Sequence, residues 1–347
     1  MADVALPVGA TQRARRVDQV LRFVARQREL SLALLILGLG SIVASQAPQL
    51  LSASNVAQVT ALASIVAVAA VGQALVLLTR NVDLSVESIV GLVAFVVADV
   101  LARRLLDIPG AILLGLTLGL GLGMVNGVLV VAGRVPAIVA TLGTMSVYRG
   151  FVFLLAGGKQ VTLTDLPPGY TDVARATIVG LPLFLVVTVT IVLFTSLFLR
   201  QTQVGRQIYA VGSNPEAAAI LGIRSGRITF AVFAACGLLA GLAGILWGME
   251  FGTINASSAT GLTLQVVAAA VVGGVNILGG SGTAVGAGLG AFFLALISNS
   301  LILLRLSQFW LQALYGLVIL AAVSLDVVLS RRVQRSVTRA RARGGAR

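Results

Sequence analysis

Residues 56–78 read VAQVTALASIVAVAAVGQALVLL, and this stretch contains no charged side chain. A helix that crosses a bilayer needs about 20 predominantly apolar residues, so the stretch predicts a membrane span. Further apolar runs lie at residues 30–44, 88–101, 110–132, 135–156, 177–199, 228–249, 264–278, 283–304 and 309–329. The run at 264–278 is short for a crossing, which indicates a broken or tilted helix. The sequence therefore predicts an all-α polytopic membrane protein with about ten transmembrane helices, which together form a transmembrane domain at residues 30–329.

The composition agrees with a membrane protein and excludes several kinds of enzyme. Of the 347 residues, 58% are hydrophobic and 11% are charged, whereas soluble domains carry about 25% charged residues. The chain has no histidine, and Cys236 is its single cysteine. Histidine-based catalysis, a disulfide within the chain and a thiolate metal cluster are therefore excluded. We expect no catalytic residue and no metal site.

Two short stretches resemble functional signatures but lack an essential part of each. Gly279-Gly280-Ser281-Gly282 resembles an intramembrane serine protease signature, yet no histidine is present to accept the proton of the serine. Gly157-Gly158-Lys159-Gln160 lacks the Ser or Thr that follows the lysine of a Walker A loop. We therefore expect no cofactor in this chain, so that any ATP and magnesium would be bound by a partner ATPase.

Basic residues are concentrated at the two ends of the chain. Six arginines lie within residues 13–28 and seven within residues 331–347, and the net charge is +13. Basic segments beside membrane spans stay in the cytoplasm and bind anionic lipid headgroups. The sequence therefore predicts a basic amphipathic segment at residues 1–29, a basic tail at residues 330–347, cytoplasmic termini and no nucleic-acid partner.

Ten spans then assign a side of the membrane to each connecting loop. The loop at residues 200–227 falls inside, and the loop at residues 250–261, which has no basic residue, falls outside. Arg103, Arg104 and Arg305 also fall outside, which counts against this topology.

Glycines recur every fourth residue within three of the predicted spans. They are Gly115, Gly119, Gly123 and Gly127 in one span, Gly237 and Gly241 in another, and Gly282, Gly286 and Gly290 in a third. Such spacing lets helix backbones approach closely, because no side chain stands between them. Packing within one subunit is favoured here over a dimer interface.

Polar residues near or within the spans are candidates for a translocation path. Residues 79–88 form the densest polar group, in which Arg80 and Asp83 are spaced to pair on one helical turn. This group is either an interfacial loop or a re-entrant turn that lines the path. The candidate path residues are Gln73, Arg80, Asp83, Asn126, Thr141, Thr144 and Asn299. Hydrogen bonding between helices is the alternative role for these side chains.

The loop at residues 200–227 contains the signals of a short, well-defined helix. Asn214 can cap it, Pro215 suits its first position, and Glu216 favours the positive end of the helix dipole. Gly222 ends the helix after about two turns. A short rigid helix between two spans could fit a groove on a partner protein, and an ordinary surface helix is the alternative.

The same loop carries a resemblance to a known family. Glu216-Ala217-Ala218, followed by Gly222, resembles the loop by which ABC importer permeases contact their ATPases. The residues before it resemble the branch that imports ribose, xylose, rhamnose and autoinducer-2, namely Gly205, Arg206, Tyr209, Ala210, Gly212 and Asn214. The other blocks that agree, in order, are residues 83–86, 136–144, 148–150, 273–274, 279–282 and Gly286.

The resemblance implies a function and a set of partners. It implies a multi-pass permease subunit in the plasma membrane, and it implies that residues 200–227 couple this subunit to ATP hydrolysis. The expected partners are a second permease subunit, identical or homologous, two cytoplasmic ATPases and an extracytoplasmic substrate-binding protein. The residues implied in coupling are Gly205, Arg206, Asn214, Pro215, Glu216, Ala217, Ala218 and Gly222.

The substrate and the competing functions follow from finer features. Residues 79–83, 136–144, 148–150 and 157–159 are most similar to permeases that import autoinducer-2, with rhamnose-type or ribose-type permeases as the alternative. Glu87 stands where these permeases usually have glycine, and Thr263 where they usually have glutamate. An ion-coupled secondary transporter is less favoured, because acidic residues are nearly absent from the middle of the spans. An intramembrane enzyme is disfavoured by the missing histidine.

Overall fold

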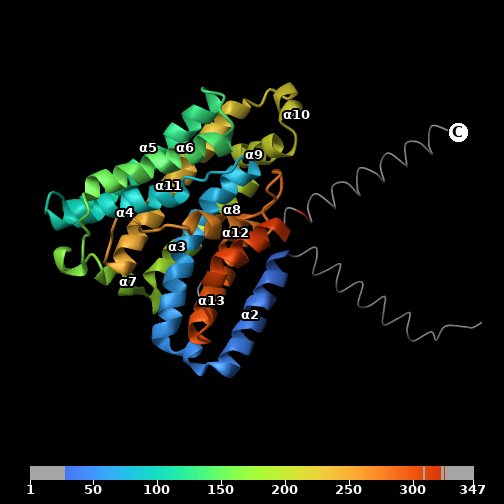
Figure 1. Cartoon of the computed structure of the whole chain (residues 1–347). Coiled ribbons are helices and arrows are strands. Elements are labelled where there is room, and N and C mark those ends of the chain that lie inside the picture. The colour runs from blue at the N-terminus through green and yellow to red at the C-terminus, as the bar shows by residue number, and fades with distance from the viewer. Residues whose placement is uncertain (1–27, 308, 322–323, 325–347) are drawn as a thin grey trace, which may run out of the picture.

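The structure is a computed structural model, and it describes residues 28–307, 309–321 and 324. The predicted segment at residues 1–29, except for its last two residues, and the predicted tail at residues 330–347 lie outside the described residues. Nearly all regular structure in the described part is helical (Figure 1). The long helices are α2 (Arg28–Gln46), α3 (Ala53–Leu78), α4 (Val86–Ala102), α5 (Ile108–Val131), α6 (Ala137–Ala156), α8 (Leu183–Gln201), α9 (Gln203–Ser213), α11 (Ser225–Phe251), α12 (Leu262–Val272) and α13 (Ala284–Leu303). The short elements are η1 (Pro48–Leu51), η2 (Leu163–Asp165), α7 (Asp172–Arg175), β1 (Thr177–Ile178), β2 (Leu181–Pro182) and α10 (Pro215–Ile220).

Helix length and hydropathy confirm an all-α polytopic membrane protein. Within the described residues, seven helices are long and apolar enough to cross a membrane, namely α2, α3, α5, α6, α8, α11 and α13. α4 has 17 residues and α12 has 11, and a further short apolar helix covers Phe309–Ala321. The short, interrupted helix that the sequence predicts at 264–278 is therefore confirmed, whereas ten crossings stay a prediction.

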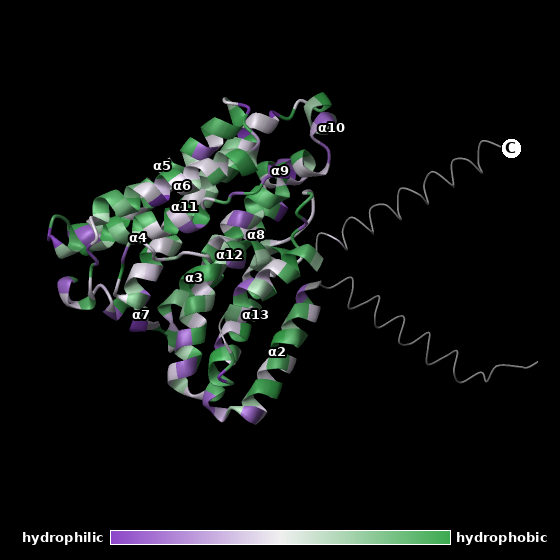
Figure 2. Ribbon diagram, viewed as in Figure 1, coloured by the Kyte–Doolittle hydropathy of each residue, from purple (hydrophilic) through white to green (hydrophobic). Residues whose placement is uncertain are grey.

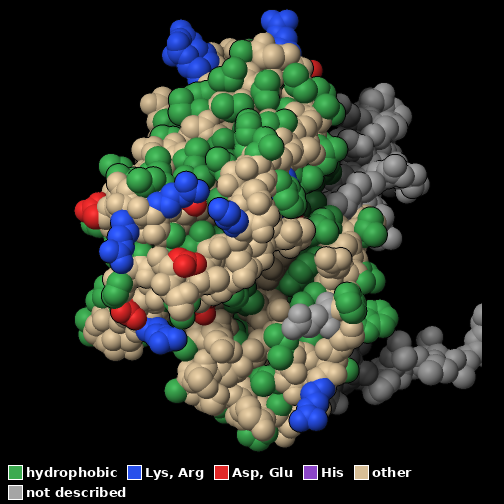
Figure 3. Space-filling view, turned by 60° about the vertical axis from the view of Figure 1, so that its left-hand side comes forward, with side chains coloured by type: hydrophobic (Ala, Val, Ile, Leu, Met, Phe, Trp, Pro, Cys, Tyr) green, Lys and Arg blue, Asp and Glu red, His purple; other side chains and the backbone are tan. Residues whose placement is uncertain are grey.

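The surface of the helix bundle is largely hydrophobic. Figure 2 shows hydrophobic residues along the outer helices, among them α2 and α5. Leu35, Leu113 and Phe153 are exposed on α2, α5 and α6. On the face seen in Figure 3, hydrophobic side chains are widely spread and charged side chains lie in a few small groups. Such a surface suits lipid, because nothing polar has to be desolvated over most of it.

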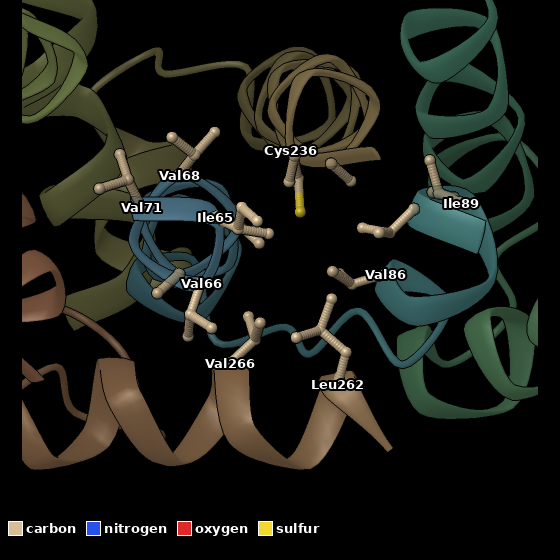
Figure 4. Packing of buried hydrophobic residues seen from close by; sticks show 14 of the residues in the cluster. Ile65, Val66, Val68, Val71, Val86, Ile89, Cys236, Leu262 and Val266 are labelled. Atoms are coloured by element: carbon tan, nitrogen blue, oxygen red, sulfur yellow. The ribbon is translucent and has the colours of Figure 1, made fainter. Parts of the chain in front are cut away.

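α3 is the central helix of the bundle. In the most hydrophobic 18-residue window of α3, 94% of the residues are buried within the chain. Figure 4 shows Ile65 and Val66 of α3 packed among Val86 of α4, Cys236 of α11 and Val266 of α12. A helix that is apolar on all sides can be buried on all sides, and this is why the stretch at residues 56–78 lies at the core.

The glycine repeats bring helix backbones into direct contact. A Cβ on Gly119 of α5 would lie 2.6 Å from the Gly237 carbonyl oxygen of α11, so only glycine fits there. Gly286 and Gly290 of α13 likewise face the backbone of α12 and the residue that follows it, Gly273. Packing within one subunit is therefore confirmed for these ladders, although Gly282 lies in the loop before α13.

The predicted start of the sixth span is wrong. Residues 177–182 form an antiparallel hairpin of β1 and β2, and α8 begins only at Leu183. Val179 and Gly180 form the turn with φ values of 52° and 77°, and a tight hairpin turn of this kind requires positive φ at both positions. Hydropathy alone missed the hairpin, because its residues are as apolar as a helix end.

Candidate functional site

The connection between α3 and α4, residues 79–85, is not helical, although Thr79, Asp83 and Ser85 in it are buried. Backbone polar groups in a membrane interior need hydrogen-bond partners within the protein. The side-chain amide of Gln73 donates to the Asp83 carbonyl (3.1 Å) and accepts from the Asp83 N–H (3.2 Å). Thr141 Oγ1 accepts from the Leu84 N–H (3.0 Å). Gln73 of α3 and Thr141 of α6 therefore supply hydrogen-bond partners to this non-helical backbone from two different helices.

The carboxylate of Asp83 lies at the centre of a buried polar network, the Asp83 cluster (Gln73, Asp83, Ser85, Asn126, Thr141 and Thr144). Asp83 Oδ1 accepts from the N–H (2.8 Å) and the hydroxyl (2.7 Å) of Ser85. The amide nitrogen of Asn126 donates to Ser85 Oγ (2.8 Å) and lies 3.3 Å from Asp83 Oδ2. Thr144 donates to Asn126 Oδ1 (2.7 Å). The cluster thus ties α3, α5 and α6 to the residues that lead into α4.

Five of the seven predicted path residues therefore come together, but they are buried and hydrogen-bonded to one another. This is the arrangement of the alternative prediction, hydrogen bonding between helices, and a role in the path stays a prediction. Asn299 lies apart and exchanges two amide hydrogen bonds with Asn55 (2.8 and 3.0 Å). Arg80 does not pair with Asp83 as its spacing suggests. Its guanidinium instead donates to the carbonyls of Gly212 and Ser213.

A second polar group joins α4, α6 and the segment before α12. Arg149 Nη2 lies 3.6 Å from Glu87 Oε1, and Arg149 Nη1 donates to the carbonyls of Ala256 (3.0 Å) and Ser258 (2.8 Å). Glu87 also contacts Thr263, so the two positions that depart from the resembled permeases are neighbours. The sequence analysis assigned no role to Arg149, although an arginine inside a predicted span was the available signal.

α10 has the start and the end that the sequence predicts. Asn214 Oδ1 accepts from the N–H groups of Glu216 and Ala217 (both 3.1 Å), and Pro215 is the first helical residue. Gly222, just beyond the helix, has a φ of 78°. These three features make α10 a short helix whose ends are set by its own sequence.

Not all of the residues that the resemblance implies in coupling are exposed on α10. Glu216 and Ala217 are exposed, but Ala218 is buried and faces the rest of the chain. Ile220 and Leu221 are 86% and 78% exposed, so they form the apolar tip of this segment, which the sequence analysis did not single out. α10 thus presents an acidic start and an apolar tip.

Gly205 and Arg206 belong to α9, the helix before α10. A Cβ on Gly205 would lie 2.5 Å from the carbonyl oxygens of Phe198 and Leu199, so glycine permits the tight turn from α8. Arg206 is exposed and donates to the Gln201 carbonyl (3.3 Å). Tyr209 donates to the Gly282 carbonyl (2.8 Å), and burial raises the pKa of this hydroxyl.

A cavity of about 950 Å³ lies at the opposite end of α3 from α9 and α10. Gln58 of α3, Arg175 of α7 and Glu250 of α11 line it together with residues of the hairpin. The sequence analysis missed this cavity, because its lining comes from segments far apart in the chain. Among the described residues, no group of three or more Cys, Asp or Glu residues is placed to hold a metal ion.

Comparison with known proteins identifies the relatives of the chain. The family described as branched-chain amino acid transport system / permease component matches residues 55–323. The autoinducer 2 import system permease protein LsrC of Salmonella typhi is 37% identical over 320 residues, which are 92% of this chain and 91% of that protein. LsrC of Escherichia coli (strain K12 / DH10B) is 38% identical over 92% of this chain and 93% of its own length. LsrC of Enterobacter sp. (strain 638) is 39% identical over 88% of each chain. No solved structure matches the chain.

Proposed function

The chain belongs to the branched-chain amino acid transport system / permease component family, and from this premise we propose that it is the permease subunit of an ABC importer for autoinducer-2 or a related monosaccharide. The subunit is a transport protein and not an enzyme, as the names of its family and its relatives state. ATP and magnesium are bound by partner ATPases. The described part of the chain holds seven helices that are long and apolar enough to cross a membrane, and α10 is the element that couples the transmembrane domain to ATP hydrolysis.

The proposed substrate rests on the relatives. Those that cover about nine tenths of the chain are named as autoinducer 2 import permeases, and the blocks at residues 79–83 and 157–159 favour the same branch. Rhamnose and ribose are the alternative substrates. Calorimetry on the binding protein encoded with this chain tests the substrate directly, with autoinducer-2, rhamnose and ribose as ligands.

Uptake that persists with an uncoupler and requires ATP would distinguish this importer from an ion-coupled transporter.

The proposed assembly contains two permease subunits, identical or homologous, two cytoplasmic ATPases and an extracytoplasmic binding protein. Both termini and α10 lie in the cytoplasm, because arginines flank the loop at residues 200–227 and are frequent in both tails. The cavity near Gln58 then opens toward the outside, where the binding protein delivers its ligand.

One observation carries the coupling role of α10: a rigid, capped helix holds two large apolar side chains, Ile220 and Leu221, in an exposed position. α10 has six residues, which is too few to span a membrane. A hydrophobic groove on a partner would bury the two side chains, and each such side chain contributes about 1.5–3 kcal/mol when fully buried. Glu216 supplies a charged contact beside them.

The experiment uses the complex of permease, ATPase and binding protein in proteoliposomes. In Glu216→Lys and Gly222→Val we expect membrane insertion to persist, whereas ligand-loaded binding protein no longer stimulates ATP hydrolysis. Valine at the positive φ of Gly222 costs about 1–3 kcal/mol and distorts the end of α10. Ala219→Ser, on the same exposed helix, serves as the matched control. Wild-type stimulation and uptake in both test variants would show that α10 is not the ATPase contact.

A further inference from the structure

Arg80 connects the end of α3 to the end of α9. Its Nε donates to the Gly212 carbonyl (2.5 Å) and its Nη2 to the Ser213 carbonyl (2.6 Å). These are the last two residues of α9, and the next residue, Asn214, caps α10. The negative end of the α9 dipole and two carbonyls without partners in the helix make this a favourable place for a guanidinium. Arg80 therefore holds the joint between α9 and α10.

The backbone and stem of Arg80 are closely packed, although the residue as a whole is exposed. Arg80 has a φ of 63°, which residues other than glycine rarely adopt. A Cβ on Gly279 would overlap the Arg80 Cγ, so the arginine stem occupies the space that this glycine leaves open. The Gly280 N–H donates to the Leu78 carbonyl (3.0 Å), next to the same site. The stem of Arg80 thus packs against the loop at residues 278–282, and its guanidinium reaches the end of α9.

Only two residues separate Arg80 from Asp83, which is fully buried in the Asp83 cluster. The segment between them is not helical, and so short a chain spans at most about 3.3–3.6 Å per residue. Gln73 and Thr141 hold its far end through the hydrogen bonds described above. Residues 79–85 therefore form a short strap between the helix that precedes α10 and a cluster shared by α3, α5 and α6.

We propose that Arg80 is a positioning residue of the transport cycle, which transmits a displacement of α10 to the Asp83 cluster through this strap. The proposal rests on the assignment of α10 as the ATPase contact. When α10 moves, its joint with α9 moves with it, and the two charge-assisted hydrogen bonds move Arg80 and the strap. The helices of the Asp83 cluster then shift relative to one another. Lysine cannot replace the arginine fully, because a single ammonium does not reproduce the planar fork.

The test compares Arg80→Gln and Arg80→Lys with the wild type and with Arg103→Gln. Arg103 is the matched control, since it pairs with Asp99 at the far end of α4 and is 62% exposed. A photoreactive maleimide on Ala219→Cys, in a Cys236→Ala background, reports whether α10 contacts the ATPase. In proteoliposomes we measure ATP hydrolysis and uptake with the binding protein carrying whichever of autoinducer-2, rhamnose and ribose it binds.

We expect Arg80→Gln to retain the crosslink while the ligand molecules taken up per ATP hydrolysed fall about tenfold or more. The ratio of uptake to hydrolysis in Arg80→Lys should lie between those of Arg80→Gln and the wild type. The ratio in Arg103→Gln should equal that of the wild type. A wild-type ratio of uptake to hydrolysis in Arg80→Gln, with the crosslink intact, would overturn the role of Arg80 alone. Loss of the crosslink in Arg80→Gln would also overturn it, by showing that Arg80 only maintains the fold. Absence of a crosslink in the wild type would overturn the coupling role of α10 and this inference together.

Discussion

Glu87 and Thr263 each cap the helix in which the other lies. Glu87 Oε2 accepts from the N–H groups of Gly261 (2.9 Å) and Thr263 (3.4 Å) at the start of α12. Thr263 Oγ1 accepts from the Glu87 N–H (3.1 Å) at the start of α4. The first N–H groups of a helix have no partner within the helix, so each side chain satisfies donors of the other helix. The two departures from the resembled permeases therefore place the carboxylate on α4 and the hydroxyl on α12 of one shared junction.

Because the capping is reciprocal, we expect simultaneous substitution of Glu87 and Thr263 to destabilise the protein less than the two single substitutions together would. Glu87→Gly removes the cap of α12 and the ion-pair partner of Arg149, and Thr263→Glu alone brings a second carboxylate beside Glu87. We expect each single variant to be less stable by about 1–3 kcal/mol and the double variant to recover a coupling energy of about 0.5–3 kcal/mol. Thermal unfolding in detergent and uptake per folded protein measure this cycle.

The ion pair of Asp99, in the last turn of α4, with Arg103, just beyond that helix, is the control for this cycle, because both side chains reach solvent. Asp99→Asn combined with Arg103→Gln should change stability by no more than about 1 kcal/mol. Strictly additive effects of Glu87→Gly and Thr263→Glu would contradict the reciprocal capping.

The Asp83 cluster predicts a specific loss in Asn126→Leu. Leucine removes the donor to Ser85 and Asp83 and the acceptor for Thr144, which leaves a buried carboxylate with fewer hydrogen bonds. We expect the protein to insert but to lose about 1–3 kcal/mol of stability and most of its uptake.

Asn299→Leu is the comparator for this variant, because it breaks a partly buried amide pair with Asn55 far from the strap. Uptake per folded protein should be nearer the wild type in Asn299→Leu than in Asn126→Leu. Equal uptake per folded protein in the two variants would show that the Asp83 cluster has no specific role in transport.

The contact between α5 and α11 predicts opposite outcomes for two neighbouring glycines. A Cβ on Gly119 would lie 2.6 Å from backbone atoms of Gly237 and Gly241, whereas a Cβ on Gly121 would meet nothing within 4 Å. Gly119→Val should therefore separate the two helices and cost about 3 kcal/mol or more, while Gly121→Val should be nearly neutral. The two variants are compared by the melting temperature of the detergent-solubilised protein, which is measured from the loss of its size-exclusion peak on heating. A melting temperature equal to the wild type in Gly119→Val would contradict the close packing.

The proposed topology predicts different labelling of two exposed positions. Val179, at the hairpin turn, is 96% exposed and should lie outside, while Leu221 should lie in the cytoplasm. In a Cys236→Ala background, Val179→Cys should react with a membrane-impermeant maleimide in whole cells. Leu221→Cys should react only after lysis, in cells that make this subunit without its ATPase. The reverse pattern would place both termini outside.

Features that depend on neighbouring residues could be predicted from the sequence. The apolar run at residues 56–78 predicts a membrane span, because the hydrophobic effect acts on composition over one helix length. The bounds of α10 follow from Asn214, Pro215 and Gly222, whose effects reach only the residues around them. The glycine spacing in α5 likewise predicts a close contact, although not with which helix.

Only the tertiary structure determines which polar side chains form hydrogen bonds with groups distant in the sequence. Arg80 and Asp83 have the spacing of a pair, yet α3 ends at Leu78 and the residues that follow are not helical, so Arg80 and Asp83 do not share a helical turn. Arg80 then finds the carbonyls of α9, and Asp83 finds Ser85 and Asn126. Glu87 and Thr263 are separated by 176 positions and meet only because α4 and α12 both begin inside the bundle. A buried polar group takes the nearest available partner in space, and that partner exists only once the helices have packed.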